Sequence, residues 1–241
     1  GHHIVTTAVE HHAVGHTLRY LEKFGFEITE LPVDRYGRVD PDAVDHAITD
    51  KTILVSVMLG NNEVGTLQPV AEIGKRVRTH KGLLFHVDAV QAAPYVDLNV
   101  DALGADFVSI AAHKFEGPKG VGALYVRHGT HILAQQHGGT QERHRRAGTE
   151  NVAGAVGLAA AFDLACAERH ETNRRLRRQR DRLKSALVSV EGTELTGHPT
   201  ERLPGLLSII GRDTDGRRLL VRVVVGFLPA AVIGGALDHP I

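Results

Sequence analysis

The sequence predicts an α/β fold: a mostly parallel β-sheet covered by helices, followed by the start of a small α+β unit. Two observations lead to this class. Short apolar runs alternate with segments in which apolar residues recur at helical spacing. Polar residues gather just past the ends of the apolar runs, which is where open α/β sheets bind their ligands. The 241 residues are enough for one large domain or for a domain and a half.

The first part of the chain predicts four strands separated by three helices. The strands are short and rich in β-branched residues, and the third is nearly continuous in apolar residues, which is typical of a parallel strand covered on both faces. In chain order we expect strand 4–7, helix 14–25, strand 28–33, helix 41–48, strand 52–59, helix 69–80 and strand 83–88.

The stretch from Phe107 is expected to be another buried strand, and it leads into His113 and Lys114. A loop with two glycines and a proline then separates it from a strand at 121–126. A lysine at the end of a buried strand loses hydration, which disfavours its charged form and makes its amine a better nucleophile for a carbonyl. The alternative is a surface lysine in a hairpin-like loop.

Beyond the last of these strands we expect a basic, glycine-bearing loop at 137–149 and one long helix over 150–190. The first half of that helix is apolar, and its second half carries a run of arginines at 174–182. We interpret this run as a solvated helix face, with nucleic-acid binding as the less favoured alternative. A strand at 206–210 would open the smaller unit, and the stretch from 226 onwards is apolar without a readable pattern.

Composition excludes several classes of protein. The formal net charge is zero, which gives no overall argument for nucleic acid or an anionic membrane as partner. No apolar run approaches a membrane span, and no signal-peptide pattern opens the sequence. The one cysteine, Cys166, excludes an internal disulfide and fits the reducing cytoplasm, where we expect the protein to reside. Cys166 falls in the apolar half of the long helix, so we expect it to serve packing rather than nucleophilic attack.

Four polar groups follow strands or open helices, and together they suggest a pyridoxal phosphate site. They are His11, Asn61-Asn62, Asp88 with Gln91, and His113-Lys114. A lysine can hold the aldehyde of this cofactor, a carboxylate can keep its ring nitrogen protonated, and a histidine can stack on the ring and move protons.

Each of these signals has a simpler alternative. Asp88 could cap a helix, and Asn62 could fill a turn. His12 and His16 lie one helical turn apart, which suggests a metal site. However, a third ligand is not indicated and the zinc-protease helix pattern is missing, so we do not expect a metal.

Five segments occur in an order that a known family shares: 9–14 (VEHHAV), 60–65 (GNNEVG), 86–91 (HVDAVQ), 112–120 (AHKFEGPKG) and 146–151 (RAGTEN). Through them the chain resembles the cysteine desulfurases of the class V aminotransferase group, which are fold-type I pyridoxal phosphate enzymes. The resemblance covers residues 4 to about 210, and several ordered motifs over this length make it specific.

The resemblance implies a role for each matching residue that would face the cofactor ring. Lys114 would be the Schiff-base lysine, and His11 would stack on the pyridine ring and share in proton transfer. Asp88 would pair with the ring nitrogen, and Gln91 would hydrogen-bond the phenolic oxygen.

Three further residues would complete the site by the same resemblance. Asn62 would lie near the phenolic oxygen and the substrate carboxylate. His113 would contact the phosphate, as would Thr149, which would reach across from the partner subunit of a homodimer. The substrate would be L-cysteine, whose sulfur passes to an enzyme cysteine with release of L-alanine and then to an acceptor such as an iron-sulfur scaffold protein. No direct nucleic-acid partner and no membrane is expected.

The resemblance also implies a division of the chain. Residues 1–150 would be a large cofactor-binding domain, 151–190 a connecting helix, and 191–241 the start of a small C-terminal domain. Ala111 stands where the family usually has a serine, and Thr140 and His144 stand where glycines are usual.

Both ends of the chain also depart from the family. The phosphate loop of the family would precede residue 1, and the persulfide-forming cysteine and a substrate arginine are missing near the other end. We therefore expect a fragment that is inactive alone. Alternatives are a selenocysteine lyase, another class V lyase, or a non-catalytic remnant that binds or dimerises.

Overall fold

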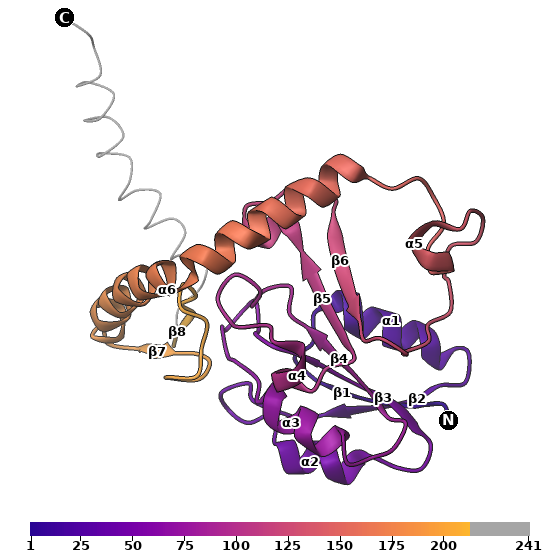
Figure 1. Cartoon of the computed structure of the whole chain (residues 1–241). Coiled ribbons are helices and arrows are strands. Elements are labelled where there is room, and N and C mark those ends of the chain that lie inside the picture. The colour runs from indigo at the N-terminus through magenta and orange to yellow at the C-terminus, as the bar shows by residue number, and fades with distance from the viewer. Residues whose placement is uncertain (213–241) are drawn as a thin grey trace, which may run out of the picture.

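The computed structural model describes residues 1–212, and its centre is a six-stranded sheet in the order β2-β1-β3-β4-β5-β6 (Figure 1). The first five strands are parallel, and β6 pairs antiparallel with β5. The predicted mostly parallel α/β sheet is therefore confirmed. The strands are β1 (His3–Thr7), β2 (Glu27–Leu31), β3 (Thr52–Met58), β4 (Leu84–Asp88), β5 (Phe107–Ala111) and β6 (Gly122–Val126).

Helices cover both faces of this sheet. Across the sheet, the step from β1 to β2 goes one way, and the steps from β2 to β3, β4 and β5 go the other way. Because such crossovers are right-handed, the helix after β1 lies on one face and the later helices lie on the opposite face. Figure 1 shows α1 on one side and the other three on the opposite side, where α3 packs against both α2 and α4. The helices are α1 (His12–Glu22), α2 (Pro41–Ala47), α3 (Val70–Val77) and α4 (Val100–Leu103).

The main core lies between the sheet and the layer formed by α2, α3 and α4. Its largest fully buried side chains include Phe85 from β4 and Ile73 from α3. Val55 and Val57 of β3 are fully buried in the same cluster. Burying apolar surface of this kind contributes roughly 25 cal/mol per Å², which makes it the main source of the stability of the sheet.

Two histidines, the buried His3 and the half-buried His86, connect the strands through their side chains. His3 of β1 hydrogen-bonds Thr29 and Thr52 on the two flanking strands, each at 2.8 Å. His86 of β4 does the same between Ser56 and Ser109, again at 2.8 Å to each. Burial lowers the pKa of His86, so its imidazole is neutral and uses one nitrogen as donor and the other as acceptor.

The chain beyond β6 forms a short helix, α5 (Gln141–His144), and a long helix, α6 (Val152–Val188). The first half of α6 packs on the 3₁₀ turn η1 (Ala112–Phe115), where the rings of Phe115 and Phe162 lie 5.4 Å apart. A two-stranded antiparallel sheet follows, formed by β7 (Thr193–Leu195) and β8 (Ile209–Gly211). The segment between them returns to the large sheet, where Leu203 N donates to Gly65 O at 2.8 Å.

Several expectations from the sequence differ from the structure. The short elements α4, η1, α5 and β7 were not predicted, and the strand expected at 206–210 is β8, which begins three residues later. Cys166 is exposed, because it lies on a face of α6 that does not pack on η1, so the prediction of a packing role is wrong. The expected solvation of the arginine run is confirmed for all its arginines except Arg180, whose guanidinium donates to Leu203 O at 3.1 Å.

Two further findings bear on the expectations for the whole chain. Within residues 1–212, no helix is long and apolar enough to cross a membrane. The predictions about the stretch from 226 onwards and about a missing cysteine loop lie outside the described residues. The proposed division at residues 150 and 190 stays a prediction.

Candidate functional site

The carboxyl ends of four neighbouring parallel strands, β1, β3, β4 and β5, carry most of the predicted site residues along one edge of the sheet. This placement follows from the strand order, because residues that follow parallel strands all leave the sheet at the same edge. The residues that the strand order places at this edge are His11, Asn62, Asp88, Gln91, His113 and Lys114.

The connections reverse direction between β1 and β3, which makes the crevice at this point the expected ligand site of an open α/β sheet. A cavity of about 410 Å³ lies here. Its walls include His11 from the start of α1 and Asn62 from the loop after β3. Tyr36 and Gly197 also line it, and neither was predicted as a site residue.

His11 is fixed by its role as the N-cap of α1. Its Nδ1 accepts a hydrogen bond from Ala13 N at 3.1 Å. A cap of this kind satisfies a backbone donor that the first turn of a helix leaves unpaired. Since Nδ1 is used by the cap and the residue is exposed, the faces of the imidazole ring remain accessible from the cavity.

Asp88 is the last residue of β4, and it is buried. Its Oδ1 accepts a hydrogen bond from Val90 N at 2.9 Å, and its backbone oxygen accepts one from Leu59 N at 2.8 Å. It pairs in register with Met58 on one side and Ser109 on the other. The hydrogen bond from Val90 thus orients the carboxylate, and the pairing with β3 and β5 fixes the backbone of Asp88.

The two asparagines of the loop after β3 have different roles. Asn61 is buried, and its Oδ1 accepts hydrogen bonds from Glu63 N at 2.9 Å and Val64 N at 2.8 Å. Arg202 stabilises the same loop by donating a hydrogen bond to Val64 O at 3.1 Å. Asn61 therefore shapes the loop, while Asn62 is left partly exposed on the cavity.

Lys114 is exposed, so the prediction that burial makes its amine more nucleophilic is wrong for the described chain. The strand β5 ends at Ala111, and η1 then turns Ala112 and Phe115 inward. His113 and Lys114 lie between these two buried residues and face solvent. Since β5 and β6 are antiparallel, Lys114 lies in the connection of an antiparallel pair, as the hairpin-like alternative required.

Thr149 is the one predicted residue that does not come to this edge through the strand order. It is exposed, and it follows α5 in the long connection between β6 and α6. In the described part of the chain it makes no hydrogen bond with the other predicted site residues. Its role from a partner subunit stays a prediction.

Sequence reasoning assigned no role to Glu10, although it directly precedes His11. Burial raises the pKa of its carboxyl to about 7, and the charge of Asp88 adds to this rise, against hydrogen bonds from Met58 and Thr7 that lower it. The only feature of the sequence that could have pointed to a role for Glu10 is its position at the start of a helix, next to a site histidine. Its partner on β3 is 48 residues away, so the local sequence could not reveal it.

The alternative of a metal site is not supported by residues 1–212, where no group of three or more histidine, cysteine, aspartate or glutamate side chains could hold an ion. His12 and His16 instead stack on each other, with ring centroids 4.8 Å apart.

Comparisons with known proteins show the family to which the chain belongs. The chain matches the Aminotransferase class-V family over residues 1–223. It is 51% identical over 221 residues to a protein of Methanosarcina thermophila named cysteine desulfurase IscS, covering 92% of this chain and 54% of that protein. It is 46% identical to a protein of the same name from Dictyoglomus turgidum, covering 92% of this chain and 57% of that protein.

Solved structures give the same result. A structure titled NifS-like protein superposes with a TM-score of 0.86 and 40% identity, covering 90% of this chain and 60% of that one. DndA from Streptomyces lividans superposes with a TM-score of 0.84 and 33% identity, covering 94% of this chain and 64% of that one. The chain thus spans a little over half the length of the curated relatives, and it belongs to the class V aminotransferase family.

Proposed function

We propose that this chain provides the cofactor-binding part of a pyridoxal phosphate-dependent cysteine desulfurase. The reaction would move sulfur from L-cysteine to an enzyme cysteine and release L-alanine. One observation carries the proposal: His11, Asp88 and Lys114 lie at or just after the carboxyl ends of three parallel strands, along the same edge of one sheet. The cysteine desulfurase names of the relatives support the choice of reaction.

The residues at this edge fit the cofactor by their chemistry. When bound, pyridoxal phosphate supplies an electron sink that stabilises negative charge at the Cα of the substrate. The buried carboxylate of Asp88 would hold a proton on the ring nitrogen. The exposed amine of Lys114 would hold the aldehyde carbon, and its accessibility suits this bond. His11, with its ring faces exposed, would stack on the ring and carry a proton at its imidazole.

Other residues would orient the substrate and the phosphate. Asn62, on the wall of the cavity, would lie near the phenolic oxygen and the substrate carboxylate, and Gln91 would hydrogen-bond the phenolic oxygen. His113 would contact the phosphate beside Lys114, and Thr149 of a second subunit would complete this contact in a homodimer. Ala111 brings no hydroxyl to the phosphate. The sulfur would pass on to an acceptor protein such as an iron-sulfur scaffold.

A binding experiment on the purified chain tests the proposal. Pyridoxal phosphate is added, and the visible absorbance of the protein fraction is recorded before and after L-cysteine. We expect a protein-bound band that responds to L-cysteine. The band should be absent from the Lys114→Arg variant and present in the Lys119→Arg control. A parent chain that retains no cofactor above the level of the Lys114→Arg variant would contradict the proposal.

A further inference from the structure

Glu10 joins three segments of the site but has no part in the chemistry proposed above. Its Oε1 accepts a hydrogen bond from Thr7 Oγ1 at 2.7 Å and one from Met58 N at 2.8 Å. Thr7 ends β1 and Met58 ends β3, the two strands that flank the point where the connections reverse. The carboxyl group therefore fastens the loop between β1 and α1 to both strand ends.

This attachment fixes the geometry between two predicted cofactor residues. His11 follows Glu10 directly and caps α1, while Met58 pairs in register with Asp88. A second tether acts on the same loop, because Asn61 Nδ2 donates to Val9 O at 3.1 Å. Glu10 and the end of β3 thus connect His11 to Asp88.

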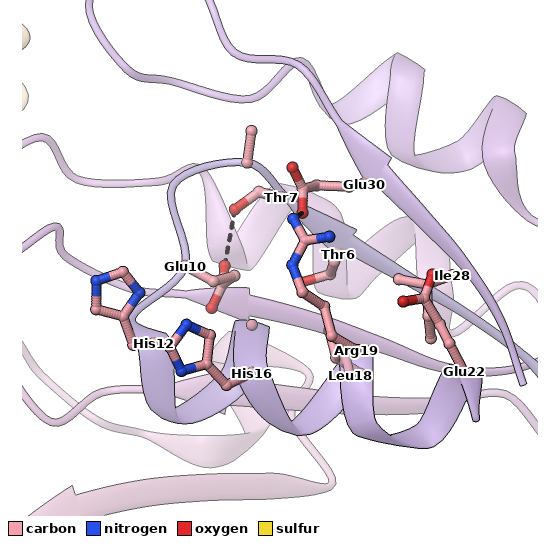
Figure 2. A pocket seen from close by; sticks show the side chains of 12 residues that line it. Thr6, Thr7, Glu10, His12, His16, Leu18, Arg19, Glu22, Ile28 and Glu30 are labelled. Carbon is pink, nitrogen blue, oxygen red and sulfur yellow. Dashed lines mark hydrogen bonds and ion pairs between the residues drawn. The ribbon is translucent and has the colours of Figure 1, made fainter. Parts of the chain in front are cut away.

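The other oxygen of Glu10 has a different environment. Oε2 is buried and has no hydrogen-bond partner among the described residues. Figure 2 shows Glu10 bonded to Thr7 on one side and facing the first turns of α1, with His12 and His16, on the other. Burying a carboxylate whose oxygen has no hydrogen-bond donor is unfavourable in free energy, whereas burying a neutral carboxylic acid in the same place is far less so.

Among residues 1–212, none of the charged or titratable groups around Glu10 forms an ion pair with it. From α1 these are His12, His16 and Arg19, and Arg19 is paired with Glu30 of β2 at 3.7 Å. Arg35 and Glu63 face it from the loops on the site side, and Asp88 from β4. The charge that acts on the pKa of Glu10 is the negative charge of Asp88, which raises it.

We propose that Glu10 is a positioning residue that holds His11 in its place relative to Asp88, and that at mildly acidic pH it does so as a neutral carboxylic acid. This inference rests on the proposed function, because only a shared cofactor makes the relation of His11 to Asp88 matter. A neutral Glu10 also removes one negative charge from the surroundings of Asp88, whose own charge is needed at the ring nitrogen.

The test uses the 241-residue chain and two substitutions at the same position. Glu10→Gln keeps an oxygen acceptor and removes the titration, whereas Glu10→Ala removes the tether as well. Asn61→Ala is the matched control, because it cuts the second tether without touching a titratable group. Carboxyl ¹³C and histidine-ring NMR spectra are recorded without cofactor across about pH 4 to 9.

We expect a carboxyl resonance, absent from Glu10→Gln, that titrates near pH 7. The His11 ring resonances should follow that titration in the parent and in Asn61→Ala, stay unaffected by it in Glu10→Gln, and shift at every pH in Glu10→Ala. With pyridoxal phosphate present, Glu10→Gln should bind within about twofold of the parent, and Glu10→Ala about tenfold more weakly, as the loss of a hydrogen-bonding group predicts.

Two results would overturn the inference. One is a Glu10 resonance that titrates at the ordinary glutamate value of 4.5. The other is a set of His11 resonances that is the same in the parent and in Glu10→Ala. A parent chain that binds no cofactor would instead count against the proposed function, and the cofactor-free spectra would still decide the state and the effect of Glu10.

Discussion

Gly74 of α3 lies so close to Leu103 of α4 that a β-carbon on Gly74 would stand 2.1 Å from the carbonyl oxygen of Leu103. That oxygen belongs to the backbone, so it cannot move aside as a flexible side chain would. We predict that Gly74→Ala separates the two helices and costs about 3 kcal/mol or more in the free energy of unfolding.

Gly15 of α1 provides the matched control, because nothing lies within 4 Å of a β-carbon added there. Gly15→Ala should stabilise the chain by about 0.5–1 kcal/mol through the better helix propensity of alanine. Urea unfolding followed by circular dichroism measures both. Equal effects of the two substitutions would show that the close contact of α3 with α4 is not formed.

The second prediction concerns the pH dependence of stability. Burial raises the pKa of Glu10 from 4.5 to about 7, so the folded chain keeps a proton that the unfolded chain loses. Stability linked to this group is therefore fully present below pH 4.5, is lost as the pH rises to 7, and stays low above that. Glu10→Gln removes this loss.

The variant should be more stable than the parent by on the order of 2–3 kcal/mol at pH 8, and the difference should shrink towards acid pH. Thermal unfolding at a series of pH values gives the measurement. For Glu22→Gln, an exposed change on α1, the curve of stability against pH should run parallel to that of the parent. A Glu10→Gln curve that also runs parallel to the parent would refute the prediction.

The third prediction concerns the hydrogen bonds from His86 to Ser56 and Ser109. His86→Leu leaves two hydroxyls without their partner inside the sheet, and each unsatisfied group costs about 1–3 kcal/mol. We expect a loss of about 2–4 kcal/mol in the free energy of unfolding. The triple change with Ser56→Ala and Ser109→Ala should recover more than half of this loss, because no polar group is then left unpaired. A triple variant less stable than His86→Leu would count against it.

The fourth prediction separates binding from catalysis at Asp88. Asp88→Asn keeps the shape of the side chain and its bond to Val90 but removes the charge expected at the ring nitrogen. In an enzyme of the relatives' length that contains this chain, exchange of the α-proton of L-alanine in heavy water should slow by about 10²–10³. Cofactor retention should change much less. An unchanged exchange rate would remove Asp88 from this role.

Much of the sheet could be predicted from the sequence, because its inner strands β1, β3 and β4 are mostly buried and read as short apolar runs between helical patterns. Predicted and observed ends differ by only a few residues, as for the strand expected at 52–59 and found at Thr52–Met58. The elements that were missed are short. The single turn of α4 depends on the side chain of Asn99, which accepts hydrogen bonds from Asp101 N and Ala102 N, and four residues are too few for a periodic signal.

The site could be predicted only in part for a related reason. Residues after parallel strands must leave the sheet at one edge, so the grouping of His11, Asp88 and Lys114 followed from the sequence. The exposure of Lys114 and of Cys166 depends on how α6 and η1 pack, which no local pattern encodes. The bond from Glu10 to Met58 depends on β1 and β3 being neighbours, and the strand order was not predictable.

The central claim is that Lys114 holds pyridoxal phosphate, and reductive trapping tests it most directly. The chain is incubated with the cofactor, reduced with borohydride and digested, and the peptides are mapped by mass spectrometry. Reduction makes the bond between the lysine amine and the cofactor carbon permanent, so the label records where that bond was. We predict a pyridoxyl group on Lys114, and none at that position in Lys114→Arg. A label on Lys119, or one spread evenly over the lysines of the chain, would contradict the claim.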